Sequence, residues 1–404
     1  MELILLAIPL FIVLIAIELI VDRYRGTGYY RLNDAISSLN AGILSRVTVI
    51  FWKLAPIAVY IYVYQHWAQF EVPLNGLTWV IAFVSYDFFY YWYHRISHER
   101  NIFWAAHVVH HSSEEYNLTT ALRQTSGSIL SWLFFLPMAL VGFDPIQTAT
   151  VAALNLLYQF WVHSRHVPKL GWYEYVFVTP SNHRVHHAVN DEYIDRNYGG
   201  VFIIWDRMFG TFQEELDDVP CVYGIRKPLN SWNPIWTNLH YYYQLIRDTW
   251  HTKRWADKIK VWFARTGWRP DDVSRRFPLK DFDINAYQKF DIQLPAFVKA
   301  YALAHLIFVI LLLSHFMFVS TELVVMDILL YGAIIYGSSF AIGIILEQRK
   351  IALPIELIRL SLFAVLLLSI DTDMYLKFSG LMIILISMAV SYKLVPQNKP
   401  VMGG

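Results

Sequence analysis

The sequence predicts an all-α, polytopic integral membrane protein: a helical bundle with a histidine-rich cap on its cytoplasmic side. Three observations lead to this fold class. Apolar residues make up 56% of the 404 residues and charged residues only 16%, whereas soluble domains carry about 25% charged residues. The mean hydropathy is +0.36. Several apolar runs approach the length of about 20 residues that a helix needs to cross a bilayer.

Charge and cysteine content argue against nucleic-acid binding, a disulfide framework and a thiolate metal site. The 33 basic residues balance 32 acidic ones, so there is no electrostatic footprint for nucleic acid. Cys221 is the only cysteine, which excludes an internal disulfide framework and a thiolate metal site. The sequence is instead rich in histidine and aromatic residues.

The N-terminal region, residues 1–93, is expected to form transmembrane helices. The first apolar run, 3–21, follows an acidic residue and precedes no small-residue cleavage site, so we expect a retained helix rather than a signal peptide. The next runs are 47–67 and 77–93. Lys53 lies inside the second run, where it could snorkel to the interface or pair within the bundle.

Three further regions follow along the chain. A histidine-rich catalytic core is expected over 94–215; it includes a membrane hairpin at 128–162, because two apolar runs flank the turn at Gly142–Pro145. Charged residues, Trp and Pro recur over 216–295, which indicates a cytoplasmic lobe. Region 296–404 returns to transmembrane helices, giving eight or nine membrane segments in all; its apolar runs are 300–319, 323–346, 351–370 and 374–392.

The short loops predict the orientation of these helices. Arg23, Arg25 and Arg31 follow the first helix, and 347–350 is also basic, whereas 68–76 holds neither Lys nor Arg. Basic loops face the cytoplasm. The N-terminus is therefore expected outside, and the histidines and the C-terminus inside, in a bacterial inner membrane or the endoplasmic reticulum.

Three histidine clusters have helical spacing. Residues at i, i+3 and i+4 share one face of a helix, so each cluster can direct its imidazoles to one point. Eight imidazoles are enough for two metal ions, and imidazole suits Fe, Zn, Cu or Ni. The clusters are His94/His98, His107/His110/His111 and His183/His186/His187.

The choice of metal rests on what surrounds the clusters. The zinc-protease pattern H-E-x-x-H is absent, because Ile102 stands where its second histidine would follow His98 and Glu99. A site at the membrane face favours an iron pair that activates oxygen on a lipid. Isolated histidines such as His66 and His240 are interpreted as ordinary polar residues.

Other polar residues are candidates for supporting these ligands. Asp87 shares a helical stripe with His94 and is predicted to accept its second ring N–H; the alternative is a protonated or water-bonded acid without a role. Glu114 and Asn117, with Arg123 and Gln124, could orient ligands or bind a reductant. A helix cap with solvent contacts is an equal alternative.

The motifs H-x3-H, H-x2-H-H and H-x2-H-H resemble those of the fatty acid hydroxylase and sterol desaturase superfamily. Within it, the block at about 80–215 is similar to alkylglycerol monooxygenases. The stretches that carry this similarity are 103–124 (Phe-Trp-Ala-Ala-His-Val-Val-His-His onwards), Thr-Pro-Ser-Asn-His-Arg-Val-His-His at 179–187, Asn-Tyr-Gly-Gly at 197–200, and Trp-Asp-Arg-Met-Phe-Gly-Thr-Phe at 205–212.

The resemblance implies a membrane-bound, non-haem diiron monooxygenase. It implies that the carbon beside the ether oxygen of an alkylglycerol is hydroxylated and that the hemiacetal collapses to an aldehyde and glycerol. It assigns two Fe ions to the eight clustered histidines, with His163 as a ninth ligand. The implied partners are a membrane lipid, O2 and an electron donor, either a redox protein or the family's reductant tetrahydrobiopterin.

Two alternatives stay open on the sequence. One is sterol or fatty acyl hydroxylation or desaturation within the same superfamily. The other is a non-catalytic metal-binding or metal-transporting membrane protein, although transport would need ionisable residues along a path across the bilayer. Asp327, Glu356 and Arg359 lie in apolar C-terminal segments, where the last two could pair; contact with substrate or another subunit is equally open.

Overall fold

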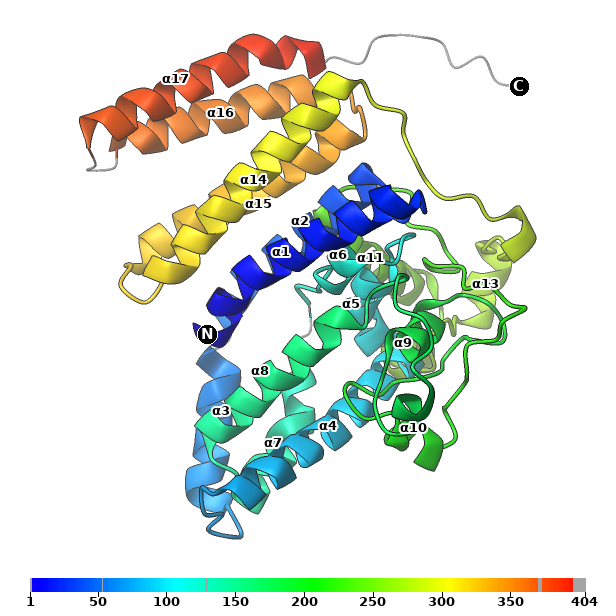
Figure 1. The fold of residues 1–404 in the computed structure, drawn as a ribbon. Coiled ribbons are helices and arrows are strands. Elements are labelled where there is room, and N and C mark those ends of the chain that lie inside the picture. Colours follow the sequence, from blue (N-terminus) through cyan, green and yellow to red (C-terminus); the bar gives the residue numbers. More distant parts are fainter. Residues whose placement is uncertain (1, 53, 128–129, 370–372, 395–404) are drawn as a thin grey trace. The chain divides into compact units, whose positions relative to one another are not determined.

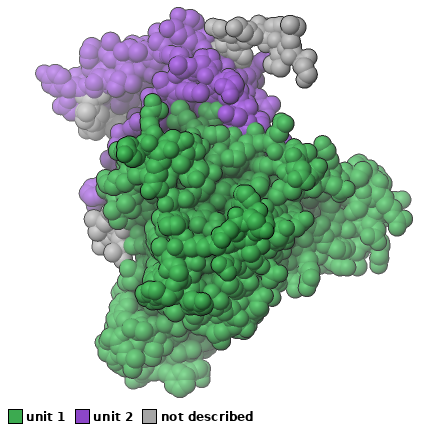
Figure 2. All heavy atoms as spheres, turned by 45° about the vertical axis from the view of Figure 1, so that its right-hand side comes forward, with its two compact units in different colours: residues 1–229, 237–289 green, residues 230–236, 290–404 purple. Residues whose placement is uncertain are grey.

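The computed structural model describes residues 2–52, 54–127, 130–369 and 373–394, which form helices, loops and isolated β-bridges. The predicted all-α fold is confirmed. Two compact units make up the chain, residues 1–229 with 237–289 and residues 230–236 with 290–404 (Figure 2).

The helices of the larger unit follow one another along the chain, and Figure 1 labels most of them. They are α1 (Glu2–Arg25), α2 (Leu32–Trp52), α3 (Leu54–Trp67), α4 (Gly76–Glu99), α5 (Asn101–His111), α6 (Leu118–Ala121), η1 (Ser131–Phe135), α7 (Leu136–Val141), α8 (Pro145–Trp161), η2 (Gly171–Tyr175), α9 (Pro180–His187), α10 (Ile204–Met208), α11 (Pro234–His251, which begins in the smaller unit), α12 (Trp255–Phe263), α13 (Asp271–Arg276) and η3 (Ile284–Ala286).

The structure differs from the sequence-based expectation of one transmembrane segment at 47–67. The structure has two helices there, α2 and α3, and Lys53 lies outside the described residues. Helix α2 starts well before residue 47 because its N-terminal half buries polar side chains inside the protein rather than in lipid. Asp34, for example, is 1% exposed and accepts a hydrogen bond from the Ser113 hydroxyl at 2.6 Å. The polar N-terminal half lies outside the apolar run that the sequence marked, although residues 32–52 taken together are long and apolar enough for a membrane span.

The apolar runs at 129–141 and 145–162 form η1, α7 and α8, while residues 128–129 lie outside the described residues. Gly142 ends α7 with a φ of 113°. A Cβ at Gly142 would stand 2.0 Å from the carbonyl oxygen of Phe70, so both the dihedral and the packing require glycine. Asp144 then caps α8 by accepting from the backbone N–H groups of Ile146 and Gln147.

The smaller unit contains α14 (Ala296–Val319), α15 (Val325–Leu346), α16 (Ala352–Ser369), α17 (Met374–Ser391) and η4 (Tyr392–Leu394). Glu356 and Arg359, whose roles the sequence left open, form a buried ion pair on α16, with Arg359 Nε 2.8 Å from Glu356 Oε2. Tyr301 of α14 donates to the same carboxylate. Asp327 lies in the first turn of α15, where the helix dipole favours a negative charge.

Four helical segments among the described residues are long and apolar enough to cross a membrane: 32–52, 296–319, 325–346 and 377–394. This supports a membrane protein. The expected total of eight or nine segments included shorter helices such as α3, which has only 14 residues.

Candidate metal centre

Three helices bring the histidine clusters to one place. Helix α4 ends just after His98, and Arg100 adopts an extended conformation that separates it from α5. Helix α9 starts at Pro180 and is fixed by a capping box between Thr179 and Asn182. Helices α4 and α5 pack together, so their histidines converge.

All nine histidines singled out from the sequence are buried and gather into two groups. Within each group the candidate ligand nitrogens lie within 4.8 Å of one another. The first group draws on all three clusters, and the second contains His163 from the end of α8. The groups are His94, His98, His107, His111 and His186, and His110, His163, His183 and His187.

Distances between the Nε2 atoms suit metal coordination. His107 Nε2 lies 3.0 Å from His94 Nε2 and 3.2 Å from His111 Nε2. In the second group, His183 Nε2 lies 3.1 Å from His163 Nε2 and 3.2 Å from His187 Nε2. Nitrogens bound at right angles to one ion at about 2.1 Å stand about 3 Å apart.

Two nitrogens of the first group are otherwise unexplained. His98 Nε2 and His186 Nε2 are buried and make no hydrogen bond to the described residues. A buried ring nitrogen without a partner is costly. A metal ion between the rings would satisfy both nitrogens, so the residues of the first group fit a metal ion; in the second group the fit rests on the distances between the Nε2 atoms.

Backbone carbonyls fix how four of the rings point. A ring N–H donated to a carbonyl leaves the other nitrogen free to bind a metal. The Nδ1 atoms of His94, His110, His163 and His186 lie 2.7, 3.0, 2.8 and 2.9 Å from the carbonyl oxygens of Tyr198, Arg123, Gln159 and Arg196, respectively.

Burial also sets the charge of the imidazoles. Desolvation lowers the pKa of His110 to about 4, and it lowers the pKa values of His107, His111, His183 and His187 well below the usual 6.5. These rings are neutral at physiological pH. Neutral imidazole is the form that binds metal.

The prediction that Asp87 accepts a hydrogen bond from the ring of His94 is wrong. The two residues are seven positions apart, about two turns of helix, and the acceptor of His94 is the carbonyl of Tyr198. Asp87 instead accepts four hydrogen bonds of 2.6–3.0 Å, from Asn155 Nδ2, the N–H groups of Val201 and Phe202, and Trp205 Nε1.

Asp87 therefore influences the histidines indirectly, by holding the loop that contains Val201 and Phe202. A second buried acid, Asp206, accepts from the N–H groups of Tyr198 and Gly199, at 2.7 and 2.8 Å. The carbonyl of Tyr198 in turn orients His94. The loop passes close to α4, since a Cβ on Gly200 would lie 2.9 Å from Asp87 Oδ1.

Glu114 and Asn117 lie in a polar network beside the histidines. Asn117 caps α6 by accepting from Thr119, and it donates to the carbonyl of Tyr29. The helix start therefore lies at Asn117, not at Ser112–Glu115. Glu114 lies 3.4 Å from the guanidinium of Arg31.

Sequence reasoning found only part of what holds the ligand-bearing segments: it named Arg123 as a candidate but missed the backbone carbonyls. Arg123 is 1% exposed, and its Nε donates to Val109 O at 2.9 Å while its own carbonyl orients His110. Only its position in a polar stretch after the second cluster marked it. The carbonyls of Tyr198, Gln159 and Arg196 carry no sequence signal, because every residue has one.

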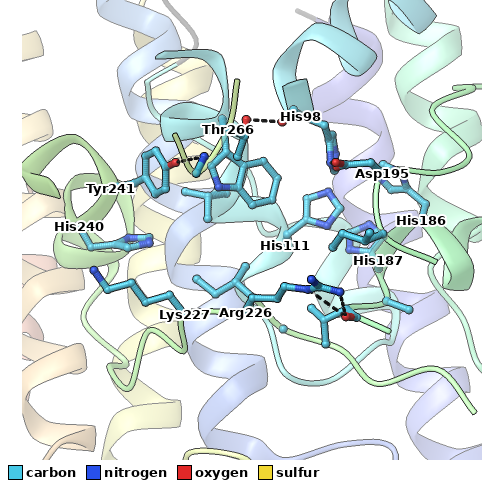
Figure 3. A pocket seen from close by; sticks show the side chains of 18 of the residues that line it. His98, His111, His186, His187, Asp195, Arg226, Lys227, His240, Tyr241 and Thr266 are labelled. Carbon is cyan, nitrogen blue, oxygen red and sulfur yellow. Dashed lines mark hydrogen bonds and ion pairs between the residues drawn. The ribbon is translucent and has the colours of Figure 1, made fainter. Parts of the chain in front are cut away.

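A cavity of about 300 Å³ adjoins both groups of histidines. Figure 3 shows His98, His111, His186 and His187 toward one side and Lys227, His240 and Tyr241 toward the other. Trp104, Val108 and Ile225 are among its apolar lining residues. The space therefore suits a molecule with both apolar and polar parts.

Residues 79–211 match the family model described as fatty acid hydroxylase. The chain is also similar to alkylglycerol monooxygenases. Identity is 37% over 367 residues with that of Homo sapiens, covering 89% of this chain and 81% of the relative. It is 36% with those of Xenopus tropicalis, covering 87% and 79%, and of Danio rerio, covering 89% and 81%. No solved structure gives a significant match.

Proposed function

The chain belongs to the alkylglycerol monooxygenase family and is a membrane-bound monooxygenase that hydroxylates a lipid, and from this premise we propose that its substrate is an O-alkyl glycerol lipid. One atom of O2 enters a C–H bond of the alkyl carbon beside the ether oxygen. The other atom leaves as water with two electrons and two protons from a reductant. The hemiacetal then passes its hydroxyl proton to the departing glycerol oxygen, the C–O bond breaks, and a fatty aldehyde remains.

The metal part of the proposal assigns one iron to each group of histidines. His94, His98, His107, His111 and His186 hold the first, and His110, His163, His183 and His187 hold the second. Bound iron supplies the oxygen activation that no amino-acid side chain provides. The protein holds neutral, oriented imidazoles and excludes bulk water by burying them.

The cavity is the observation that carries the choice of substrate. Four of the clustered histidines line it, and so do apolar side chains and polar groups such as Lys227, Gln244 and Tyr241. An alkylglycerol has the same two parts, a polar glycerol and an apolar chain, with the reacting carbon where they join. Trp104 and Val108 would contact the chain, while Lys227 and Gln244, which hydrogen-bond each other at 2.6 Å, would contact the glycerol hydroxyls.

Two further parts of the proposal rest on family resemblance and on charge. Tetrahydrobiopterin is the proposed reductant because the family uses it. The histidines are proposed to face the cytoplasm, because the loop after α1 is basic and 68–76 is not. A cytoplasmic site is accessible to a soluble reductant.

Product analysis tests the substrate. Purified protein in lipid nanodiscs, supplied with iron, tetrahydrobiopterin and 18O2, receives an alkylglycerol or the matching acylglycerol. We expect fatty aldehyde from the alkylglycerol, with the label in its carbonyl oxygen before exchange with water, and none from His186→Ala protein. A hydroxylated or desaturated acyl or sterol product in place of aldehyde would instead establish the alternative reactions of the superfamily.

A further inference from the structure

Helix α11 has two chemically different faces. Thr237, Gln244 and Asp248 point into the protein and are at most 6% exposed. The opposite face carries large apolar side chains at helical spacing that are 51–80% exposed: Leu239, Tyr243, Ile246 and Trp250. This face is unusual because α11 is not one of the four candidate membrane spans of the described residues.

Helix α12 carries a second stripe of exposed apolar side chains. Trp255, Ile259 and Phe263 recur every four residues and are 81%, 68% and 57% exposed. Asp257 and Val261, on the other side, are buried. With only nine residues, α12 is too short to cross a bilayer. We call the seven exposed side chains of α11 and α12 the apolar face.

The chemistry of this face suits a lipid surface more than a protein partner. Trp and Tyr concentrate where membrane meets water, since each has an apolar body and a polar tip. Cations also flank the face: Lys253, Arg254, Lys260 and Arg265 are exposed. An amphipathic helix with aromatic side chains and flanking Lys and Arg lies in the headgroup region and attracts anionic lipid.

The two helices are bonded to the helix that carries the second histidine cluster. Asn101, the first residue of α5, donates to Val261 O at 2.8 Å and accepts from the Tyr241 hydroxyl at 2.7 Å. A buried ion pair between Asp248 and Arg269, at 2.6 Å, fastens the end of α11 to the segment after α12. The two helices that carry the apolar face are thus hydrogen-bonded to the helix that bears His107, His110 and His111.

We propose that α11 and α12 lie in the headgroup layer of the membrane, with the apolar face inserted and the flanking cations on anionic lipid. Helix α11 then has lipid on one side and the cavity on the other, where His240, Tyr241 and Gln244 line the space beside the histidines. The cavity is thereby held at the bilayer surface, where an amphiphilic substrate resides. This placement is independent of the substrate proposed above.

Depth-dependent fluorescence quenching tests the placement without measuring activity. In full-length protein with Cys221→Ser, single cysteines at Trp250→Cys and Trp255→Cys carry an environment-sensitive fluorophore in nanodiscs holding one chain each. Two control positions bracket them: Leu311→Cys in α14, 64% exposed in a candidate span, and Asp217→Cys, whose native side chain is 93% exposed.

We expect brominated phospholipid to quench positions 250 and 255 nearly as strongly as 311, and aqueous iodide to quench them several-fold less than 217. Iodide quenching equal to that at 217 would mean a solvated face and would overturn the proposal. Protection from both quenchers would mean a protein-covered face, by a second copy or another part of the chain, and would overturn it equally.

The cations are tested by lipid composition. Replacing neutral with anionic phospholipid should move the labels at positions 250 and 255 deeper into the bilayer, and high salt should reverse this shift in depth. The charge reversals Lys253→Glu, Arg254→Glu and Lys260→Glu together should abolish it. Equal depth in neutral and anionic bilayers would refute the role given to the cations.

Discussion

At the scale of single residues, the position of each imidazole depends on a backbone group as much as on the histidine itself. The carbonyls of Tyr198 and Arg196 orient His94 and His186, which come from different helices. Both carbonyls lie in a loop where Asp195 and Asn197 adopt φ values of 57° and 56°. Non-glycine residues in this conformation store strain and need external support. Asn197 receives it by donating to Asn182 O and Gln213 O.

Two single variants, each lacking one histidine of one group, test the two metal sites independently. His186→Ala should reduce bound iron from two to one per chain, because its Nε2 points into the first group only. His183→Ala should remove the other iron, and both variants should lose turnover. Elemental analysis of purified protein measures this. His66→Ala is the matched control, since His66 is exposed and its Nδ1 bonds to Tyr62 O. Two irons in either cluster variant would contradict the assignment.

Asp87 is a positioning residue, and its substitution should act through the loop. Asp87→Leu leaves the donors on Asn155, Val201, Phe202 and Trp205 unpaired, at about 1–3 kcal/mol each. We therefore expect a lower melting temperature and less bound iron. Asp87→Asn keeps one acceptor oxygen and should reduce activity about 10–100-fold, the usual cost of losing a ligand's supporting group.

Melting curves and iron content of the two Asp87 variants measure both effects. The exposed Glu71→Gln serves as the control. A normal iron content and melting temperature in Asp87→Leu would show that the loop does not depend on the carboxylate.

At the scale of elements, buried polar side chains that find partners stabilise helical segments with few apolar residues. Helix α2 is stable because its polar residues find partners on the segment after α5: Arg123 donates to Ser37 and Ser38, and Ser113 to Asp34. In the smaller unit a similar set ties three helices together, since Arg359 of α16 also donates to Ser338 of α15 and lies 2.9 Å from His305 Nδ1 of α14.

The Glu356–Arg359 pair should behave as a coupled unit. Glu356→Gln leaves a buried guanidinium without its counter-charge, which typically costs about 3–5 kcal/mol. Arg359→Met leaves a buried carboxylate without its counter-charge, with a similar penalty. The double variant removes both charges and should recover most of the loss. Thermal unfolding in detergent gives the cycle, with the exposed Glu322→Gln as control. Additive losses would mean that the two charges do not stabilise each other.

At the scale of the whole molecule, the sequence predicted what depends on local spacing. The apolar runs predicted an all-α membrane protein, which the structure confirms. The spacing of the histidines predicted that each cluster directs its imidazoles to one point; this holds for His94 and His98, but the other two clusters each divide between the two groups. The sequence could not sort nine histidines into two groups, because neighbours such as His110 and His111 point to different groups. The four hydrogen bonds to Asp87 come from residues at least 68 positions away, and spacing along one helix cannot reveal them.

Charge asymmetry between loops predicts the orientation of the whole chain. Arg23 and Arg25 end α1, and Arg31 precedes α2, whereas the connection before Gly76 holds no Lys or Arg. Cytoplasmic loops retain such cations. A reporter inserted beside the exposed Leu74 should therefore be external, and one fused to the C-terminus cytoplasmic.

Changing the charges should change the orientation if they cause it. Replacing Arg23, Arg25 and Arg31 by Gln should leave a mixture of the two orientations, because the N-terminal cations usually have the largest influence. Arg31 also contacts Glu115 at 2.6 Å, so the Arg23/Arg25 pair alone serves as the variant without that lost contact. Protease protection of the two reporters in sealed vesicles measures the outcome. An external C-terminal reporter in the unaltered chain would place the histidines on the side away from a cytosolic reductant and would overturn the proposed location of the site.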